Sequence, residues 1–220
     1  MKRKSFLSYL GLSFLGTFFL SGKPPLHTIL RTACNDPVTP PVPEGPFYKN
    51  EQLNRINIIE NQKGTPVDYI FKVEDKNCKP IAGAIVDIWQ CNNEGIYSDF
   101  KQEHTDSEKW LRGYQLTNEQ GICRFTAVFP GWYDGRITHL HVKVLIGKEE
   151  VLTTNCFFPK DIENEVYSSP LYPKGANPAT IQQDLELRVD TTTARHDALV
   201  MQVEKDNTGK LIASYTIAIS

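Results

Sequence analysis

The chain has 220 residues, of which 40% are hydrophobic and 23% charged, and its 24 Lys and Arg against 26 Asp and Glu give a formal net charge of −2. This size and composition predict one domain with a substantial core plus an appendage, and exclude a disordered or fibrous protein. The near-neutral balance provides no basic surface for a phosphate backbone, so we expect no nucleic acid partner.

The N-terminus has the pattern of an export signal. Lys2, Arg3 and Lys4 are followed by residues 6–20, which are apolar apart from Ser, Thr and Gly. This stretch is shorter than the roughly 20 residues that span a bilayer, which favours a secretory leader over a membrane helix. We therefore expect a signal peptide at residues 1–22, a protein exported to the periplasm or the exterior, and no stable membrane span. A lipid anchor stays open.

An extended, Pro-rich segment is expected at residues 23–44, followed by a β-sandwich domain at residues 45–220. Short runs with alternating apolar residues recur between turn signals, and no stretch beyond the leader shows a helical period. The pattern predicts an all-β fold of two packed sheets, with long functional loops at residues 98–113 and 160–181. The expected strands are residues 67–73, 84–90, 123–129, 140–146, 151–158, 184–189, 198–203 and 211–219.

The cysteines show no metal-binding spacing. None of the five is part of a CxxC pair, which argues against a zinc site built from thiolates. In an oxidising compartment they form at most two bridges, and several of them equally fit small buried apolar side chains. Their pairing stays open from sequence. The five are Cys34, Cys78, Cys91, Cys123 and Cys156.

A His-x-His pair indicates a metal site. On a strand, His139 and His141 point to one face while Leu140, Val142 and Val144 point to the other. A cupin site requires a Glu shortly after the second His, and none is present there. A zinc hydrolase requires a third ligand, whereas His27, His104 and His196 lie in segments where solvation explains them.

The remaining interpretation completes the site with tyrosines. Phenolate is a hard anionic ligand with an ordinary pKa near 10, so only a strongly Lewis-acidic ion such as ferric iron keeps it ionised at neutral pH. Tyr133 stands at a Gly-bracketed corner just before the histidines, and Tyr97 follows the predicted strand at residues 84–90. Both are placed to join the histidines.

A family resemblance supports this interpretation. The sequence resembles the intradiol catechol dioxygenases, specifically their shorter, exported single-chain members, across roughly residues 40–220. The resemblance implies a prealbumin- or transthyretin-like β-sandwich that holds one non-haem Fe(III) through Tyr97, Tyr133, His139 and His141. Five ordered blocks carry it: EGPFY at 44–48, VDIWQC..EGIYS at 86–98, LRGYQLT..G at 111–121, PGWYDGR..HLH at 130–141 and LTTNCFFP at 152–159.

The resemblance also implies a reaction. A catecholic ring would be cleaved between its two hydroxylated carbons with dioxygen, giving a cis,cis-muconate type product, and Tyr133 would be the ligand that leaves the metal. Arg136 would face the negative charge that develops on the ring. Asn155 occupies the position where the family usually has Gln, and Tyr48 is a candidate to line the pocket.

A second hypothesis from the sequence is a secreted, non-catalytic transthyretin-like binding module. The turn-rich blocks around residues 79–84 and 118–125 suit such a module, but it has no reason to retain two tyrosines and two histidines as a set. The choice of catechol, the oligomeric state, a homo-oligomer included, and the cleavage site of the leader stay open.

Overall fold

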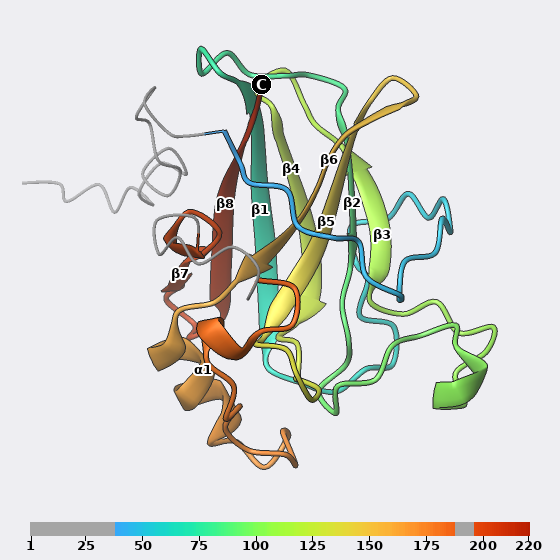
Figure 1. Cartoon of the computed structure of the whole chain (residues 1–220), viewed down its shortest axis with the longest axis vertical. Coiled ribbons are helices and arrows are strands. Elements are labelled where there is room, and N and C mark those ends of the chain that lie inside the picture. Colours follow the sequence, from blue (N-terminus) through green and yellow to red (C-terminus); the bar gives the residue numbers. More distant parts are fainter. Residues whose placement is uncertain (1–37, 188–195) are drawn as a thin grey trace, which may run out of the picture.

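The computed structural model describes residues 38–187 and 196–220, which form two four-stranded sheets packed face to face (Figure 1). One sheet has the order β4-β1-β8-β7 and the other the order β3-β2-β5-β6. The predicted all-β sandwich is confirmed. The strands are β1 (Pro66–Asp75), β2 (Ile85–Trp89), β3 (Arg112–Leu116), β4 (Ile122–Val128), β5 (His139–Ile146), β6 (Glu149–Phe157), β7 (Gln202–Lys205) and β8 (Leu211–Ile219).

Alternation along the strands builds the core between the sheets. In β1 the side chains of Val67, Tyr69, Phe71 and Val73 share one face and are completely buried, as their spacing predicts. β1 lies in the middle of its sheet, antiparallel to β4 and parallel to β8. The opposite sheet contributes a matching row from β5, in which Leu140, Val142 and Val144 are also completely buried.

Two predicted strands differ from the structure. The strand expected at residues 184–189 is wrong over its described part, residues 184–187, which form a turn after the short 3-10 helix Ile181–Gln183. There, the backbone N–H groups of Glu186 and Leu187 donate to the Asp184 carboxylate instead of to a neighbouring strand. The strand expected at 198–203 is shifted to β7, and Val200 makes only an isolated bridge with Phe157.

Two elements of the structure are not predicted by the sequence pattern. β3 begins inside the predicted loop 98–113, and it shows no alternation of apolar residues, because on one face Arg112 is buried while Leu116 is 52% exposed. The predicted loop 160–181 contains a helix, α1 (Lys160–Tyr167). Eight residues span only two turns, so its apolar residues are too few to establish a period.

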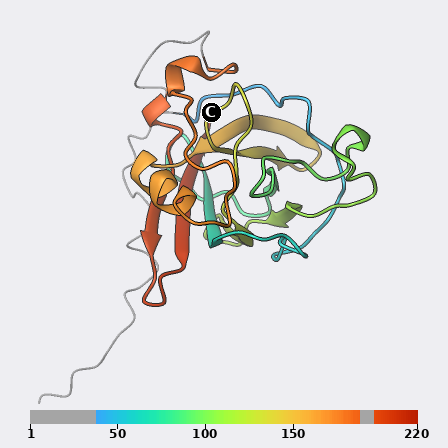
Figure 2. The ribbon, with the colours of Figure 1, turned by 90° about the horizontal axis from the view of Figure 1, so that it is seen from below.

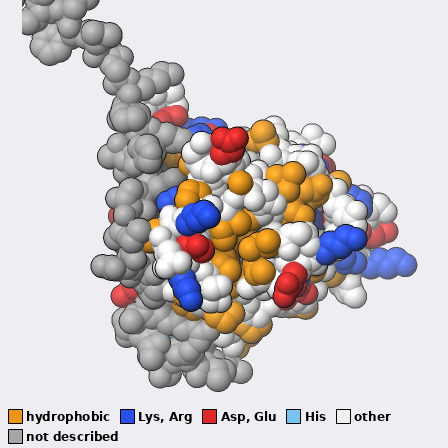
Figure 3. All heavy atoms as spheres, turned by 90° about the horizontal axis from the view of Figure 1, so that it is seen from above, with side chains coloured by type: hydrophobic (Ala, Val, Ile, Leu, Met, Phe, Trp, Pro, Cys, Tyr) orange, Lys and Arg blue, Asp and Glu red, His pale blue; other side chains and the backbone are white. Residues whose placement is uncertain are grey.

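The long connections gather at one end of the sandwich, the lower end in Figure 1. Figure 2 looks at this end and shows α1 and the 3-10 turn Lys101–Glu103 on opposite sides of it. Figure 3 shows the other end, where apolar side chains gather in the middle and charged ones at the rim. In the part of the chain that the structure describes, no helix combines the length and apolar character needed to cross a bilayer.

Several sequence predictions lie outside the described residues. These are the leader at 1–22, most of the Pro-rich segment at 23–44, and residues Cys34 and His27. Cys91, Cys123 and Cys156 are buried, and burial raises the pKa of each thiol. These three cysteines therefore act as small core side chains, one of the two alternatives that the sequence left open.

Candidate metal centre

The site lies on the outer face of the sheet that contains β5. Cross-strand register aligns three side chains in one row, since His141 of β5 pairs with Trp89 of β2 on one side and Asn155 of β6 on the other. The Trp89 and His141 rings stack, with centroids 4.7 Å apart and planes 3° apart. This row holds the His141 imidazole rigidly at the end of the sheet where the loops gather.

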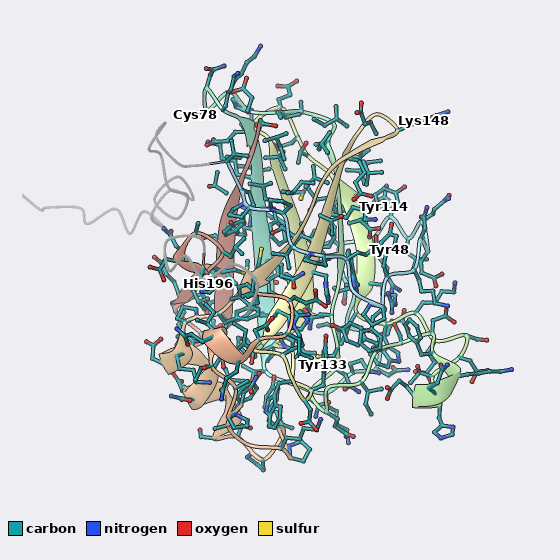
Figure 4. All side chains as sticks on the ribbon, viewed as in Figure 1. Tyr48, Cys78, Tyr114, Tyr133, Lys148 and His196 are labelled. Carbon is teal, nitrogen blue, oxygen red and sulfur yellow. The ribbon has the colours of Figure 1, made fainter. Side chains whose placement is uncertain are left out.

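Four potential donor atoms converge beside this row. His139 Nε2 lies 3.1 Å from His141 Nε2 and 3.2 Å from the Tyr133 hydroxyl. The Tyr97 hydroxyl lies 3.1 Å from His141 Nε2 and 3.5 Å from His139 Nε2. Figure 4 places Tyr133 at the loop-rich lower end of the sandwich. The structure therefore brings together the four side chains that the sequence analysis singled out.

The two tyrosines come from two loops that touch through glycines. Tyr97 follows β2 and Tyr133 follows β4. The amide of Gly131 donates to the Asn92 carbonyl at 2.9 Å, and a Cβ on Gly131 would lie 2.6 Å from the Asn93 oxygen. A Cβ on Gly95 would likewise overlap the carbonyl of Trp132. Only glycine permits this approach of the two backbones.

We expect Gly95→Ala to separate the two tyrosine loops and to destabilise the fold by about 1–3 kcal/mol through overpacking, in addition to backbone strain. Gly83→Ala is the matched control, because both glycines have positive φ, 83° and 72°, but a Cβ on Gly83 meets nothing within 4 Å. Denaturant unfolding and metal content measure the two effects. Equal losses of stability and of metal in both variants would show that backbone strain alone is responsible.

Burial sets the protonation of the four groups. Burial, together with the positive charge of Arg136, holds the pKa of His139 well below its usual value, and the pKa of His141 is lowered in the same direction. Burial also raises the pKa of Tyr97 well above 10 and that of Tyr133 to about 12, although Arg136 opposes the shift at Tyr133. Both imidazoles are therefore neutral at pH 7, and the phenols require a cation to ionise.

The donor set fits a single ion. Two ligands that each lie about 2.0–2.1 Å from one ion are at most about 4.2 Å apart. The four donor–donor distances between His139, His141, Tyr97 and Tyr133, 3.1–3.5 Å, are within this limit. His139 Nδ1 is 2.7 Å from the Ile137 carbonyl, which fixes its hydrogen there and leaves the Nε2 lone pair for an ion. No cluster of three or more His, Cys, Asp or Glu suited to a metal occurs among residues 38–187 and 196–220.

Arg136 and Asn155 connect to the same centre. The Arg136 Nη2 donates to Asn155 Oδ1 at 2.6 Å, and Asn155 Nδ2 lies 2.9 Å from His141 Nδ1. Since a guanidinium only donates, the amide oxygen faces Arg136 and the amide nitrogen faces His141 Nδ1, which then accepts. A neutral His141 in this arrangement carries its hydrogen on Nε2, so binding of an ion there requires that hydrogen to leave or the Asn155 amide to turn over. Asn155 is therefore a link between Arg136 and a potential metal ligand.

The segment of residues 44–48 covers the site. Phe47 stacks on Tyr97 at 4.2 Å with a 7° angle between the rings and meets Tyr133 edge-on. Tyr48 packs on Trp89 and donates to Asp87 Oδ2 at 3.1 Å, so the structure does not bring its hydroxyl to the four donors. Sequence reasoning missed Phe47 and Trp89, although both lie in the resembling blocks next to residues it named.

The other histidines lie apart from the centre. His104 is exposed on the turn after Lys101–Glu103. His196 is buried and its Nε2 has no hydrogen-bond partner among the described residues, so the expectation that solvation explains this histidine is wrong. Figure 4 shows His196 on the side of the molecule away from Tyr48.

Comparison with known proteins assigns the family. A family model described as dioxygenase matches residues 43–197. An intradiol ring-cleavage dioxygenase from Tetranychus urticae has a solved structure that matches with a TM-score of 0.75 and 28% identity, over 84% of this chain and 94% of that one. This chain belongs to the intradiol ring-cleavage dioxygenase family. The matched range includes Tyr97, Tyr133, His139 and His141.

Curated members of the family match over shorter ranges. A hydroxyquinol 1,2-dioxygenase from Rhizobium sp. (strain MTP-10005) is 32% identical over 138 residues, which is 53% of this chain and 46% of the relative. A catechol 1,2-dioxygenase from Acinetobacter lwoffii is 31% identical over 100 residues, 43% of this chain and 32% of the relative. The matches to these two relatives thus cover less than half of their length.

Proposed function

We propose that this intradiol dioxygenase family member binds one ferric ion and cleaves a catecholic ring between its two hydroxylated carbons with dioxygen, yielding a cis,cis-muconate type diacid. The observation that carries the proposal is the convergence of two phenol oxygens and two imidazole nitrogens within 3.1–3.5 Å in a buried site. The hydroxyquinol and catechol dioxygenases among its relatives support the substrate class.

The donor types favour Fe(III) over softer or weaker ions. Tyr97, Tyr133, His139 and His141 would hold it, and hard phenolate donors prefer a hard, highly charged cation. Because burial raises the pKa of both phenols, the ion must supply the energy that keeps them ionised. Bound there, ferric iron would supply a Lewis acid that accepts both catechol oxygens and makes the ring reactive toward dioxygen.

Tyr133 is the residue best placed to accept a proton from the catechol. Its side chain is half-buried, whereas Tyr97 is fully buried beneath Phe47. Arg136 lowers the pKa of both phenols relative to burial alone, which favours the ionised form that can accept a proton. Tyr97 then stays in place while Tyr133 turns away with one of the two hydroxyl protons, and the second proton leaves to solvent.

Arg136 supplies fixed positive charge beside the reacting ring. Its side chain is buried and oriented before substrate arrives, because Asn155 and Asp184 both accept hydrogen bonds from it. A cation that is already in place, in a site with little water, stabilises negative charge that develops on the ring, and the protein does not have to reorganise for this. The aromatic wall of buried Trp89 and Tyr97 and partly buried Phe47 excludes water from the same space.

Iron analysis and oxygen uptake test the proposal. Purified protein is expected to bind about one iron per chain, to absorb visible light through phenolate-to-iron charge transfer, and to shift that absorption when catechol is added. Reaction under ¹⁸O₂ is expected to give a ring-opened diacid that contains both oxygen atoms of the labelled dioxygen. A colourless, iron-free protein that only binds catechols would support the transthyretin-like binding module instead.

We also propose, from the sequence alone, that the chain is exported after removal of residues 1–22. Fractionation of cells that express the full chain, followed by N-terminal sequencing of the mature protein, tests this. An intact N-terminus in the cytosolic fraction would contradict it.

A further inference from the structure

Asp184 is a buried carboxylate that no sequence pattern singles out. It is completely buried, and both of its oxygens lie 3.0 Å from Arg136 Nε. It also accepts hydrogen bonds from the backbone amides of Ile137, Glu186 and Leu187, at 2.9, 3.0 and 3.3 Å. These donors satisfy both oxygens of the buried carboxylate.

The carboxylate holds Arg136 at one end of a continuous hydrogen-bonded series. Asp184 occupies the Nε edge of the guanidinium, while Nη2 of the same group reaches Asn155 at 2.6 Å. Asn155 in turn lies 2.9 Å from His141 Nδ1. Two rigid anchors on one planar group fix both its position and its rotation, so the guanidinium is oriented before any ligand binds.

The pairing also makes the buried charge of Arg136 tolerable. Arg136 and Asp184 have side chains that are 4% and 0% exposed, and their ion pair measures 3.0 Å. Removing one partner of such a pair leaves an uncompensated buried charge, which tends to draw the other toward water. Without Asp184, the Arg136 side chain is therefore expected to leave its position beside Asn155.

We propose that Asp184 is a positioning residue for the ring-cleaving reaction, acting through Arg136, so that the turn after Ile181–Gln183 controls the geometry of the site. This proposal rests on the proposed function. A purely structural role is the competing explanation, because the Leu185 amide also donates to the Gly135 carbonyl at 2.9 Å and ties the same two segments together.

A double-mutant cycle separates the two explanations. Asp184→Asn in the wild-type background is expected to lower kcat for catechol about 10- to 100-fold, with iron content and KM within about twofold of wild type. In an Arg136→Ala background the same substitution is expected to change kcat less than about twofold, because the group it positions is gone. Asp184→Glu keeps the carboxylate, so its kcat is expected to fall less than that of Asp184→Asn.

A second readout does not depend on activity. In ¹⁵N-arginine NMR of the iron-free protein, the Nε–H of Arg136 is expected to exchange slowly with solvent in wild type and rapidly in Asp184→Asn. Arg112 is an internal reference, because its buried Nε donates to Ser98 Oγ at 2.8 Å and is untouched by the change. Glu74→Gln is the matched control, since Glu74 is also a buried carboxylate paired with a cation, Lys72, at 2.6 Å.

Each outcome decides between the proposals. If iron-loaded wild type cleaves no catechol, the proposed function fails and the role of Asp184 fails with it. If wild type is active but Asp184→Asn matches it in kcat and in Nε–H exchange, only the Asp184 proposal is overturned. An equal loss of kcat in both backgrounds, or the same loss in Glu74→Gln, would show a structural role and overturn it as well. Should Asp184→Asn fold poorly, Asp184→Glu, which displaces the carboxylate by one methylene, is measured in both backgrounds instead, and equal losses of kcat in the two would overturn the proposal.

Discussion

Replacing His141 with alanine is expected to remove nearly all bound iron and, with it, ring cleavage. The imidazole is completely buried, stacked on Trp89, and its Nε2 lies 3.1 Å from both His139 Nε2 and the Tyr97 hydroxyl. Loss of an outer contact alone lowers metal affinity about 10- to 100-fold, and loss of the ligand itself lowers it further. Metal analysis and the visible charge-transfer band measure the result.

His104→Asn is the matched control for this variant. His104 is exposed and has a φ of 57°, a left-handed conformation that Asn tolerates better than Ala. The control is expected to retain iron and colour. Iron bound at full stoichiometry by His141→Ala, with an unchanged spectrum, would mean that the metal is held elsewhere and would remove the basis of the proposed reaction.

The fold class and the placement of the histidines could be predicted from local pattern. The period of two along β5 puts Leu140 and Val142 in the core and His139 and His141 on the other face. In the structure Leu140 and Val142 belong to the core cluster between the sheets, whereas His139 and His141 are buried on the opposite face by the loops that cover the site. No local pattern relates Tyr97 and Tyr133 to that strand. Their convergence depends on two loops from β2 and β4, so it is predicted from ligand chemistry and from the resemblance to a family rather than from periodicity.

What could not be predicted depends on long-range contacts. Asp184 reaches Arg136 across 48 positions, and its flanking leucines suggested a strand because Leu185 and Leu187 alternate. In the structure Leu185 is 47% exposed, and the alternating leucines do not belong to a strand of either sheet. Similarly, Arg112 is buried in β3 because its guanidinium bonds Ser98 and the Phe47 carbonyl, a reason that lies outside the strand.

Replacing Tyr133 with phenylalanine is expected to lower kcat about 10²- to 10⁴-fold while the protein still binds iron through the other three ligands. The reason is that, in the proposed reaction, Tyr133 acts both as a donor to the ion and as the acceptor of a catechol proton, and phenylalanine can do neither. Its half-buried ring keeps its packing against Phe47 in the variant, so the aromatic wall is preserved. Activity per bound iron is the quantity to compare.

Tyr97→Phe provides the contrast that tests this division of roles between the two phenols. Tyr97 is fully buried, stacked under Phe47, and its hydroxyl lies 3.1 Å from His141 Nε2, so it has no freedom to leave the ion. We expect this variant to lose both iron and colour, whereas Tyr133→Phe keeps a weaker band from the remaining phenolate. If Tyr133→Phe instead loses the metal and Tyr97→Phe keeps it with low turnover, the two roles are reversed.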